Sequence, residues 1–197
     1  SEKISLLNYE RYIKWSLPIN KKNAHPALLL FQGDVYKGIS VSDFKKEDFV
    51  FAQKSLRILS GLYGILKPLD LIQPYRLEMG TQIKIGKHND LYDFWGDEIT
   101  KAINEDKNSD YLINLASVEY FKSINKEKLN SKLINIIFKE KRNGDYKIIG
   151  INAKKARGLM SRFIIKNKIS NPKELKKFKA ENYSYNKNLS SGSDWIF

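Results

Sequence analysis

The chain has 197 residues, of which 42% are hydrophobic and 12% aromatic, and these values fit one folded domain and exclude a disordered chain. It has no cysteine and only two histidines, His25 and His88, which excludes disulfides and thiol catalysis and argues against a metal centre or an iron-handling protein. The longest purely apolar run, residues 27–31, is far shorter than the ~18 residues that cross a bilayer. The net charge of +13 instead indicates a polyanionic partner, and no cofactor is predicted.

The first third of the chain predicts two helices that flank a buried strand. Residues 1–16 place apolar side chains on one broad face, which is typical of a helix. The apolar run 27–31 predicts a buried strand. Ser42 is expected to cap a second helix that extends through Leu59.

The middle of the chain predicts a short strand, a helix and another buried strand. Residues 82–85 alternate between polar and apolar side chains. Asp90 is expected to cap one helix over residues 91–103, and residues 111–115 predict the buried strand. Ser117 then precedes a short helical segment.

The last third predicts a β-hairpin and a basic helix. Residues 133–139 and 146–151 are rich in β-branched residues, and the Asn143-Gly144 dipeptide between them favours a type I′ turn. A helix over residues 153–168 follows. The interleaved elements predict an α+β (mixed α/β) fold. We expect a single domain, residues 1–197, with helices around a central mixed sheet.

The predicted basic helix concentrates the positive charge of the chain. Residues 151–180 hold ten Lys or Arg and one acid, Glu174, a net charge of +9. At helical spacing, one arc is apolar and the other carries cations around Gly158, which are Lys154, Lys155, Arg157 and Arg162. A glycine there lets a polyanion backbone come close, although it is also compatible with an exposed, lysine-rich helix. We favour an anion-binding face.

A second candidate lies in the glycine-containing turn within residues 56–76. It resembles a helix-hairpin-helix element, whose backbone amides hold a DNA phosphate. The residues that would contribute are Gly61, Tyr63, Gly64 and Lys67. The two glycines are three residues apart, whereas the usual hairpin has them two apart, and Pro68 disfavours a long second helix. A simple helix C-cap at Gly61 is the alternative interpretation.

Polar residues after the predicted strands suggest an alternative, enzymatic function. The set comprises Asp34, Arg76, Ser117, Glu119 and Tyr120. Such a cluster could act on a phosphorylated or nucleotide substrate, because clefts form at strand ends. No histidine has an evident place beside Ser117, and the sequence has neither a nucleophile elbow nor a phosphate loop. A structural ion network explains the same residues, and no catalytic residue is assigned.

Five ordered segments resemble the bacterial peroxide stress protein YaaA family, formerly a family of unknown function. They are FQGDVYKG (31–38), LRILSGLYGILKPLDLIQPYRLEMG (56–80), LYDFWGD (91–97), INLASVEYFK (113–122) and NAKKARGLMSRFII (152–165). The family opens with an apolar strand and an ISPAK-type segment, which we do not find before the matched region. We therefore expect the chain to lack that N-terminal strand segment.

The resemblance implies a cytoplasmic protein of the peroxide response that limits iron-dependent oxidative damage, with a fold particular to the family. It also implies binding of double-stranded or distorted DNA through a cationic cleft and a helix-hairpin-helix-like element. By position, that element falls on residues 59–64, and the cleft would be lined by the four cations around Gly158, with Arg76 as a further candidate. Contacts should be independent of sequence, because no helix presents a set of side chains for base edges. We expect a monomer with no membrane association and no protein partner.

Overall fold

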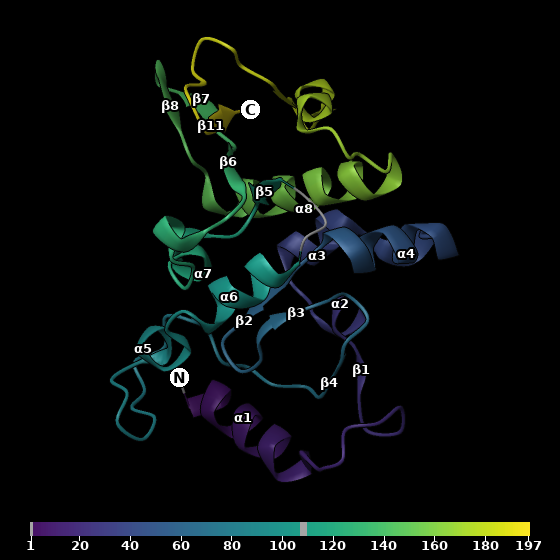
Figure 1. Cartoon of the computed structure of the whole chain (residues 1–197), viewed down its shortest axis with the longest axis vertical. Helices are drawn as coiled ribbons and strands as arrows, with labels where there is room; N and C mark the ends of the chain where they lie inside the picture. The colour runs from purple at the N-terminus through teal and green to yellow at the C-terminus, as the bar shows by residue number, and fades with distance from the viewer. Residues whose placement is uncertain (1, 107–109) are drawn as a thin grey trace.

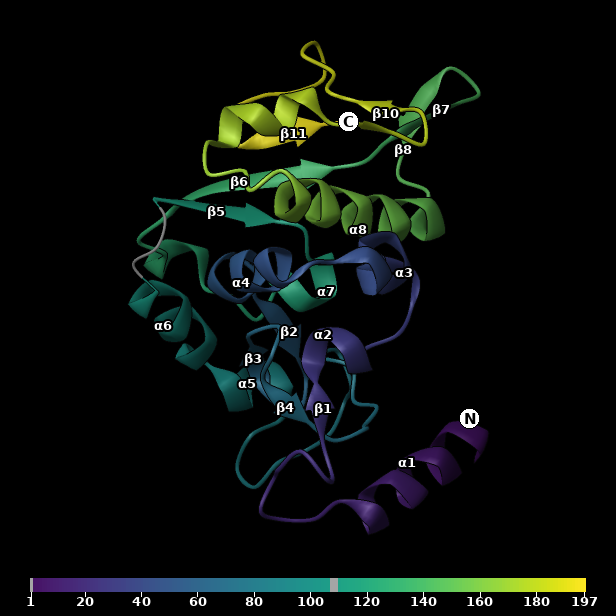
Figure 2. The same cartoon turned by 90° about the vertical axis from the view of Figure 1, so that its right-hand side faces the viewer.

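The computed structural model describes residues 2–106 and 110–197 and shows an elongated α+β molecule (Figures 1 and 2). The α+β class is as predicted. The N-terminal helix lies at one end of the long axis, and the C-terminal segments lie at the other. No helix in the described ranges is long and apolar enough to cross a membrane.

The N-terminal elements differ from the prediction in two places. They are α1 (Glu2–Lys14), β1 (His25–Pro26), α2 (Ala27–Leu30), α3 (Asp34–Ile39), the 3-10 turn η1 (Val41–Asp43) and α4 (Lys46–Ser55). The apolar run 27–31 forms the short helix α2, so the predicted strand is wrong. A short buried run does not distinguish a strand from a helix by periodicity, and here Pro26 immediately precedes the first helical residue. The helix predicted to extend through Leu59 begins at Lys46, beyond Ser42, and ends at Ser55.

The predicted helix-hairpin-helix element is a β-hairpin. β2 (Ile58–Ser60) pairs antiparallel with β3 (Gly64–Leu66), and β4 (Leu71–Ile72) pairs with β1. Leu56 already has an extended backbone, with φ −93° and ψ 138°, so the chain leaves the helix before the turn. The helix C-cap interpretation of Gly61 is wrong for the same reason. Residues 82–85 form no strand either, and only an isolated bridge joins Ile85 to His88.

Local capping signals in the middle of the chain were predicted correctly. Asp90 accepts a hydrogen bond from the amide of Asp93 at 2.8 Å at the start of α5 (Leu91–Trp95). The single predicted helix is divided at Gly96, whose φ of +47° interrupts it before α6 (Glu98–Glu105). The strand predicted over residues 111–115 is β5 (Tyr111–Asn114), and Ser117 caps α7 (Val118–Phe121).

The largest described sheet is parallel and has three strands in the order β11-β6-β5. The C-terminal elements are η2 (Lys126–Lys128), β6 (Lys132–Ile137), β7 (Glu140–Arg142), β8 (Asp145–Lys147), α8 (Gly150–Lys166), η3 (Pro172–Lys177), β9 (Lys179–Ala180), β10 (Tyr183–Ser184) and β11 (Asp194–Ile196). The expectation of a central mixed sheet is wrong, because the antiparallel pairs are separate two-stranded units. The Asn143-Gly144 turn is confirmed, with φ values of 53° and 89°, and it joins β7 to β8.

Helix α8 is packed on two sides. Ala153, Ala156 and Met160 are buried in a cluster with Ile134 and Phe138 of the sheet segment. The other side of the helix contacts α3 and α4, which lie next to α8 in both cartoon views (Figures 1 and 2). Only part of the predicted cationic arc therefore remains open to a partner.

Candidate nucleic-acid interface

Gly158 is buried, and its missing side chain serves the packing of α3 against α8. A Cβ atom added at Gly158 would lie 2.0 Å from the carbonyl oxygen of Val35 and 2.8 Å from the Cα atom of Gly38. A Cβ atom at Gly38 would in turn lie 2.4 Å from the carbonyl oxygen of Lys155. The two glycines let the helix backbones touch. The prediction that Gly158 admits a polyanion backbone is therefore wrong, because α3 occupies that space.

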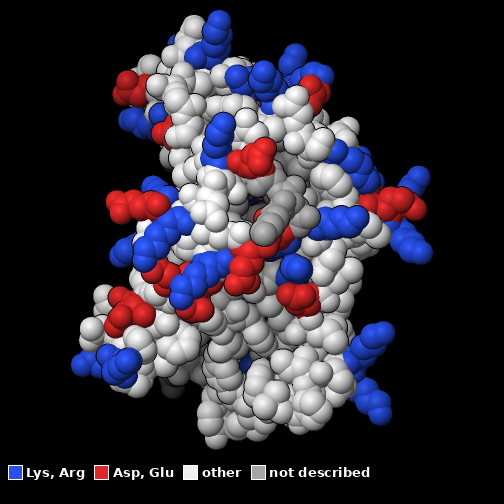
Figure 3. All heavy atoms as spheres, in the orientation of Figure 1, with Lys and Arg blue, Asp and Glu red and all other residues white. Residues whose placement is uncertain are grey.

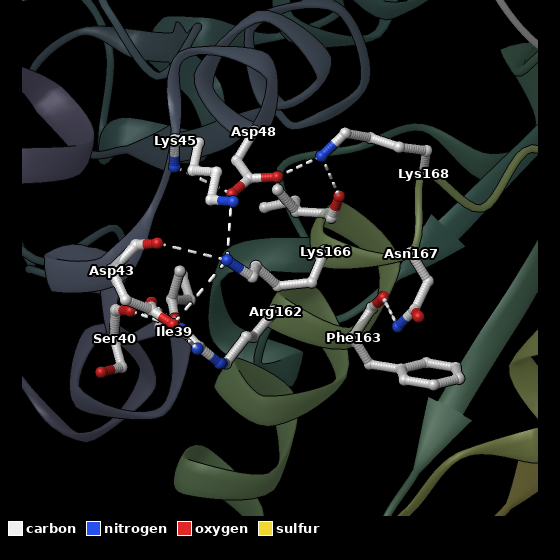
Figure 4. A network of polar contacts seen from close by, with 11 residues as sticks. Ile39, Ser40, Asp43, Lys45, Asp48, Arg162, Phe163, Lys166, Asn167 and Lys168 are labelled. Atoms are coloured by element: carbon white, nitrogen blue, oxygen red, sulfur yellow. Dashed lines mark hydrogen bonds and ion pairs between the residues drawn. The ribbon is translucent and has the colours of Figure 1, made fainter.

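The cations near the C-terminal end of α8 are neutralised by two carboxylates from η1 and α4 (Figure 4). Arg162 donates two hydrogen bonds to Asp43, at 2.8 and 2.5 Å, and one to the carbonyl oxygen of Ile39 at 3.2 Å. Lys166 lies 3.1 Å from Asp48, which also receives a short hydrogen bond from Lys168. These ion pairs join segments about 120 residues apart in sequence. We call the group of Asp43, Asp48, Arg162, Lys166 and Lys168 the ion-pair lock.

Both carboxylates of this lock are held in the ionised form. The hydrogen bond from Lys168, followed by that from the Lys45 amide, lowers the pKa of Asp48 well below its usual range. The hydrogen bond from Arg162 lowers the pKa of Asp43 in the same way. A carboxylate with a lowered folded-state pKa stabilises the fold above its unfolded pKa of about 3.9, and this contribution is lost as the pH falls through the folded value. At neutral pH both carboxylates are therefore ionised, and the cations of the lock are paired with them instead of being available to phosphates.

The N-terminal half of α8 has cations without acidic partners. Lys154 is exposed, and neither Lys154 nor Arg157 forms an ion pair among the described residues. Arg157 is half-buried, and burial lowers its pKa because desolvation disfavours the charged guanidinium. Lys155, by contrast, lies 2.9 Å from Glu181. The unneutralised part of the predicted face is thus Lys154 with Arg157.

The glycines of the β2–β3 hairpin are also used inside the protein. A Cβ atom at Gly61 would lie 2.5 Å from the carbonyl oxygen of Leu77, and one at Gly64 would lie 2.8 Å from the ring of Trp95. Trp95 also donates a hydrogen bond to the Gly61 carbonyl at 3.0 Å. The hydroxyl of Tyr63 accepts a hydrogen bond from a backbone amide, at 3.2 Å. The structure therefore has no helix N-terminus at this turn to hold a phosphate.

The two predicted DNA anchors do not line one surface. Both cartoon views place α3 and α4 between α8 and the β2–β3 hairpin (Figures 1 and 2). Lys67 is exposed on the hairpin side. Arg76 is half-exposed and lies 4.0 Å from Glu78.

Three members of the polar set proposed for an enzyme, Arg76, Glu119 and Tyr120, contact residues 78–80, and their polar groups are used in these contacts. Tyr120 donates a hydrogen bond to Glu78 at 2.7 Å, and Glu119 accepts one from the amide of Gly80 at 2.9 Å. Burial and the hydrogen bond to Glu78 raise the pKa of Tyr120, which keeps its hydroxyl protonated. Ser117 caps α7 through its hydroxyl. Asp34 pairs with Lys37 of its own helix at 3.4 Å and shares no described contact with the others.

The described residues contain no group of three or more His, Cys, Asp or Glu side chains that could hold a metal ion.

Comparison with known proteins settles the family. A sequence profile described as "Peroxide stress protein YaaA" matches residues 1–189. The chain belongs to the peroxide stress protein YaaA family. It is 55% identical over 198 residues to a UPF0246 protein of Acaryochloris marina, covering all of this chain and 79% of the relative. It is 53% identical to UPF0246 proteins of Teredinibacter turnerae and Saccharophagus degradans, over all of this chain and 78% of each relative. The resemblance inferred from the five segments is confirmed, and membership is consistent with a role in peroxide stress.

The net charge of this YaaA-family chain is divided unevenly between its two parts. Residues 110–197 contain nineteen Lys and Arg against eight Asp and Glu, a net charge of +11 out of +13. Figure 3 shows the same trend on one face, where a belt of mixed charge crosses the middle and Lys and Arg predominate at the upper end. The cationic surface is therefore a property of the C-terminal part of the chain.

The two acids that decide which cations stay available were not predicted from the sequence. Asp43 and Asp48 lie far from the basic helix in sequence, and no local pattern links them to Arg162. The basic character of the β7–β8 hairpin was not predicted either, although Lys141, Arg142 and Lys147 flank the predicted turn.

Proposed function

We propose that this YaaA-family protein binds DNA through non-specific phosphate contacts and limits iron-dependent oxidative damage during peroxide stress. The main support for this proposal is that residues 110–197 hold nearly all of the net charge. Within this part, Lys154 and Arg157 have no acidic partner among the described residues. Cations without an internal counterion gain affinity by neutralising phosphates and releasing counterions. The protective role follows from the family and is part of the proposal.

The proposed contact surface is smaller than the one expected from sequence alone. Arg162 and Lys166 are paired with Asp43 and Asp48, so transferring them to a phosphate would require breaking three ion pairs. Lys154 and Arg157 need no such exchange. We therefore place the phosphate contacts at the N-terminal half of α8 and on the adjoining basic segments.

DNA binding is better supported than an enzyme acting on a phosphorylated or nucleotide substrate. Such an enzyme needs a general base or nucleophile that is available to substrate. Glu78 and Tyr120 are hydrogen-bonded to each other, and the Ser117 hydroxyl is used as a helix cap. These contacts support a structural role for the cluster.

The test measures the affinity for a perfectly paired 20-base-pair duplex by fluorescence anisotropy, at about 50 and about 200 mM salt. We expect the affinity to fall at least about 100-fold over this range, because each phosphate contact adds roughly 0.9 to the slope of log affinity against log salt. Two duplexes of unrelated sequence should give the same result. The absence of binding at the lower salt concentration, or an affinity independent of salt, would refute the proposal.

A further inference from the structure

The β7–β8 hairpin is an exposed arm beside the start of α8. Both cartoon views draw it projecting beyond the three-stranded sheet (Figures 1 and 2). Residues 141–148 are all exposed. At the base of the arm, Glu140 accepts hydrogen bonds from Asn152 and Tyr183, each at 2.7 Å. The arm is therefore fixed at one end, and its remaining surface meets solvent.

The strand register gives the arm two chemically different faces. The opposed pairs are Glu140↔Lys147, Lys141↔Tyr146 and Arg142↔Asp145. Side chains alternate between the faces along each strand, and directly opposed residues share a face. The first and third pairs thus share one face, and the middle pair occupies the other.

The first face neutralises its own charge. Arg142 lies 2.9 Å from Glu140, and Lys147 lies 3.9 Å from Asp145. The two cations are therefore each matched by an acid on the same face. This face is a poor candidate for an anionic partner.

The second face combines a cation with an aromatic ring and has no acid. Lys141 forms no ion pair among the described residues, and 43% of the surface of Tyr146 is exposed. The apolar residues that follow in the chain, Ile148 and Ile151, are 55% and 67% exposed. Lys154 is also exposed, one helical turn after Ile151. Exposed apolar side chains that lie close in the chain to uncompensated cations are typical of an interaction surface.

This combination of groups fits nucleic acid in which bases are unpaired or unstacked. A phosphate backbone alone would satisfy Lys141 and Lys154 but would leave the tyrosine ring and the isoleucines in water. Unpaired bases offer flat apolar surfaces beside phosphates, and aromatic side chains stack on them without a sequence preference. Charge complementarity disfavours an ordinary basic or neutral protein surface as the partner.

We infer that this second face of the β7–β8 arm binds DNA at unpaired or unstacked bases, with Tyr146 stacking on a base and Lys141 contacting an adjacent phosphate. The inference rests on the proposed DNA binding and adds to it. It identifies which DNA feature the arm recognises and which residues do so.

The experiment compares two DNA probes with the same base-paired sequence, a perfectly paired duplex and that duplex with a three-nucleotide bulge in one strand. Tyr146→Ala should weaken binding to the bulged probe about tenfold or more, because one base–aromatic stack is worth roughly that factor. Binding to the paired probe should change less than twofold. Tyr146→Phe should retain the wild-type affinity for the bulge, because stacking needs the ring and not the hydroxyl.

Two matched controls separate stacking from general effects. Tyr9→Ala removes an exposed tyrosine from α1, at the opposite end of the molecule, and should leave both affinities unchanged. Arg142→Ala removes a cation from the self-neutralised face and should weaken both probes by less than twofold. Circular dichroism of each variant should match the wild type, because the replaced side chains are exposed.

Three results would overturn the inference. The first is equal loss on both probes with Tyr146→Ala, the second is no loss on either, and the third is a Tyr146-dependent dimer in light scattering, which would assign the face to a second copy of the chain. If the wild type binds neither probe at about 50 mM salt, the proposed function fails and the inference fails with it. If the wild type binds paired DNA with a steep salt dependence while the Tyr146 variants are unchanged, only the inference fails.

Discussion

Replacing Gly158 with alanine is expected to lower the free energy of unfolding by about 3 kcal/mol, the upper part of the range for overpacked sites. In an isolated helix the same change would stabilise by about 1 kcal/mol, because alanine has the higher helix propensity. Here the new methyl group would meet the carbonyl oxygen of Val35 at 2.0 Å, and that atom belongs to the backbone of α3. Relief would require α3 and α8 to move apart. Urea denaturation followed by circular dichroism measures the loss.

The matched control is Gly150→Ala at the start of the same helix. A Cβ atom there would meet no atom within 4 Å, so this variant should be as stable as the wild type or slightly more stable. Gly38→Ala should resemble Gly158→Ala, because its Cβ atom would lie 2.4 Å from the carbonyl oxygen of Lys155. A Gly158→Ala variant as stable as the wild type would show that the helices are not in backbone contact.

Replacing Lys154 and Arg157 together with alanine is expected to lower the slope of log affinity against log salt by about 2, with a loss of DNA affinity of tenfold or more at low salt. These two cations have no acidic partner among the described residues, so a phosphate can use their full charge. Arg162→Ala should leave the slope unchanged and should instead lower stability, because Arg162 is bound to Asp43. Fluorescence anisotropy at four or more salt concentrations gives the slopes.

The control for total charge is the double variant Lys21→Ala with Lys22→Ala. Both lysines are exposed in the loop after α1. Replacing them removes the same amount of charge, but from the N-terminal part of the molecule. Their slope should equal that of the wild type. The contrary result is that Arg162→Ala reduces the slope as much as the double substitution of Lys154 and Arg157. That result would mean that phosphate displaces Asp43 from Arg162, and the proposed surface would have to include the C-terminal end of α8.

Features fixed by neighbours in the chain were predictable from sequence. The caps at Asp90 and Ser117 and the Asn143-Gly144 turn depend on a few adjacent residues, and all three are confirmed. The α8 helix was also predicted, because its apolar positions repeat at helical spacing over four turns.

Features fixed by tertiary contacts were not predictable in the same way. The role of Gly158 depends on Gly38, which lies 120 positions earlier, and the role of Arg162 depends on Asp43. A glycine in a cationic arc looks the same in sequence whether it faces a helix or a phosphate. The β2–β3 hairpin was missed because the run after α4 continues the helical spacing of apolar residues although its backbone is extended from Leu56. Tertiary pairing overrides local propensity in such short segments.

The most direct test of the proposed surface is lysine footprinting. The protein is treated with an amine-acetylating reagent at about 50 mM salt, with and without saturating duplex DNA, and modification of each lysine is quantified by mass spectrometry. We expect DNA to reduce the modification rates of Lys141 and Lys154 several-fold and to leave those of Lys21 and Lys22 unchanged. Protection concentrated in residues 2–106, with Lys154 still fully reactive, would contradict this expectation.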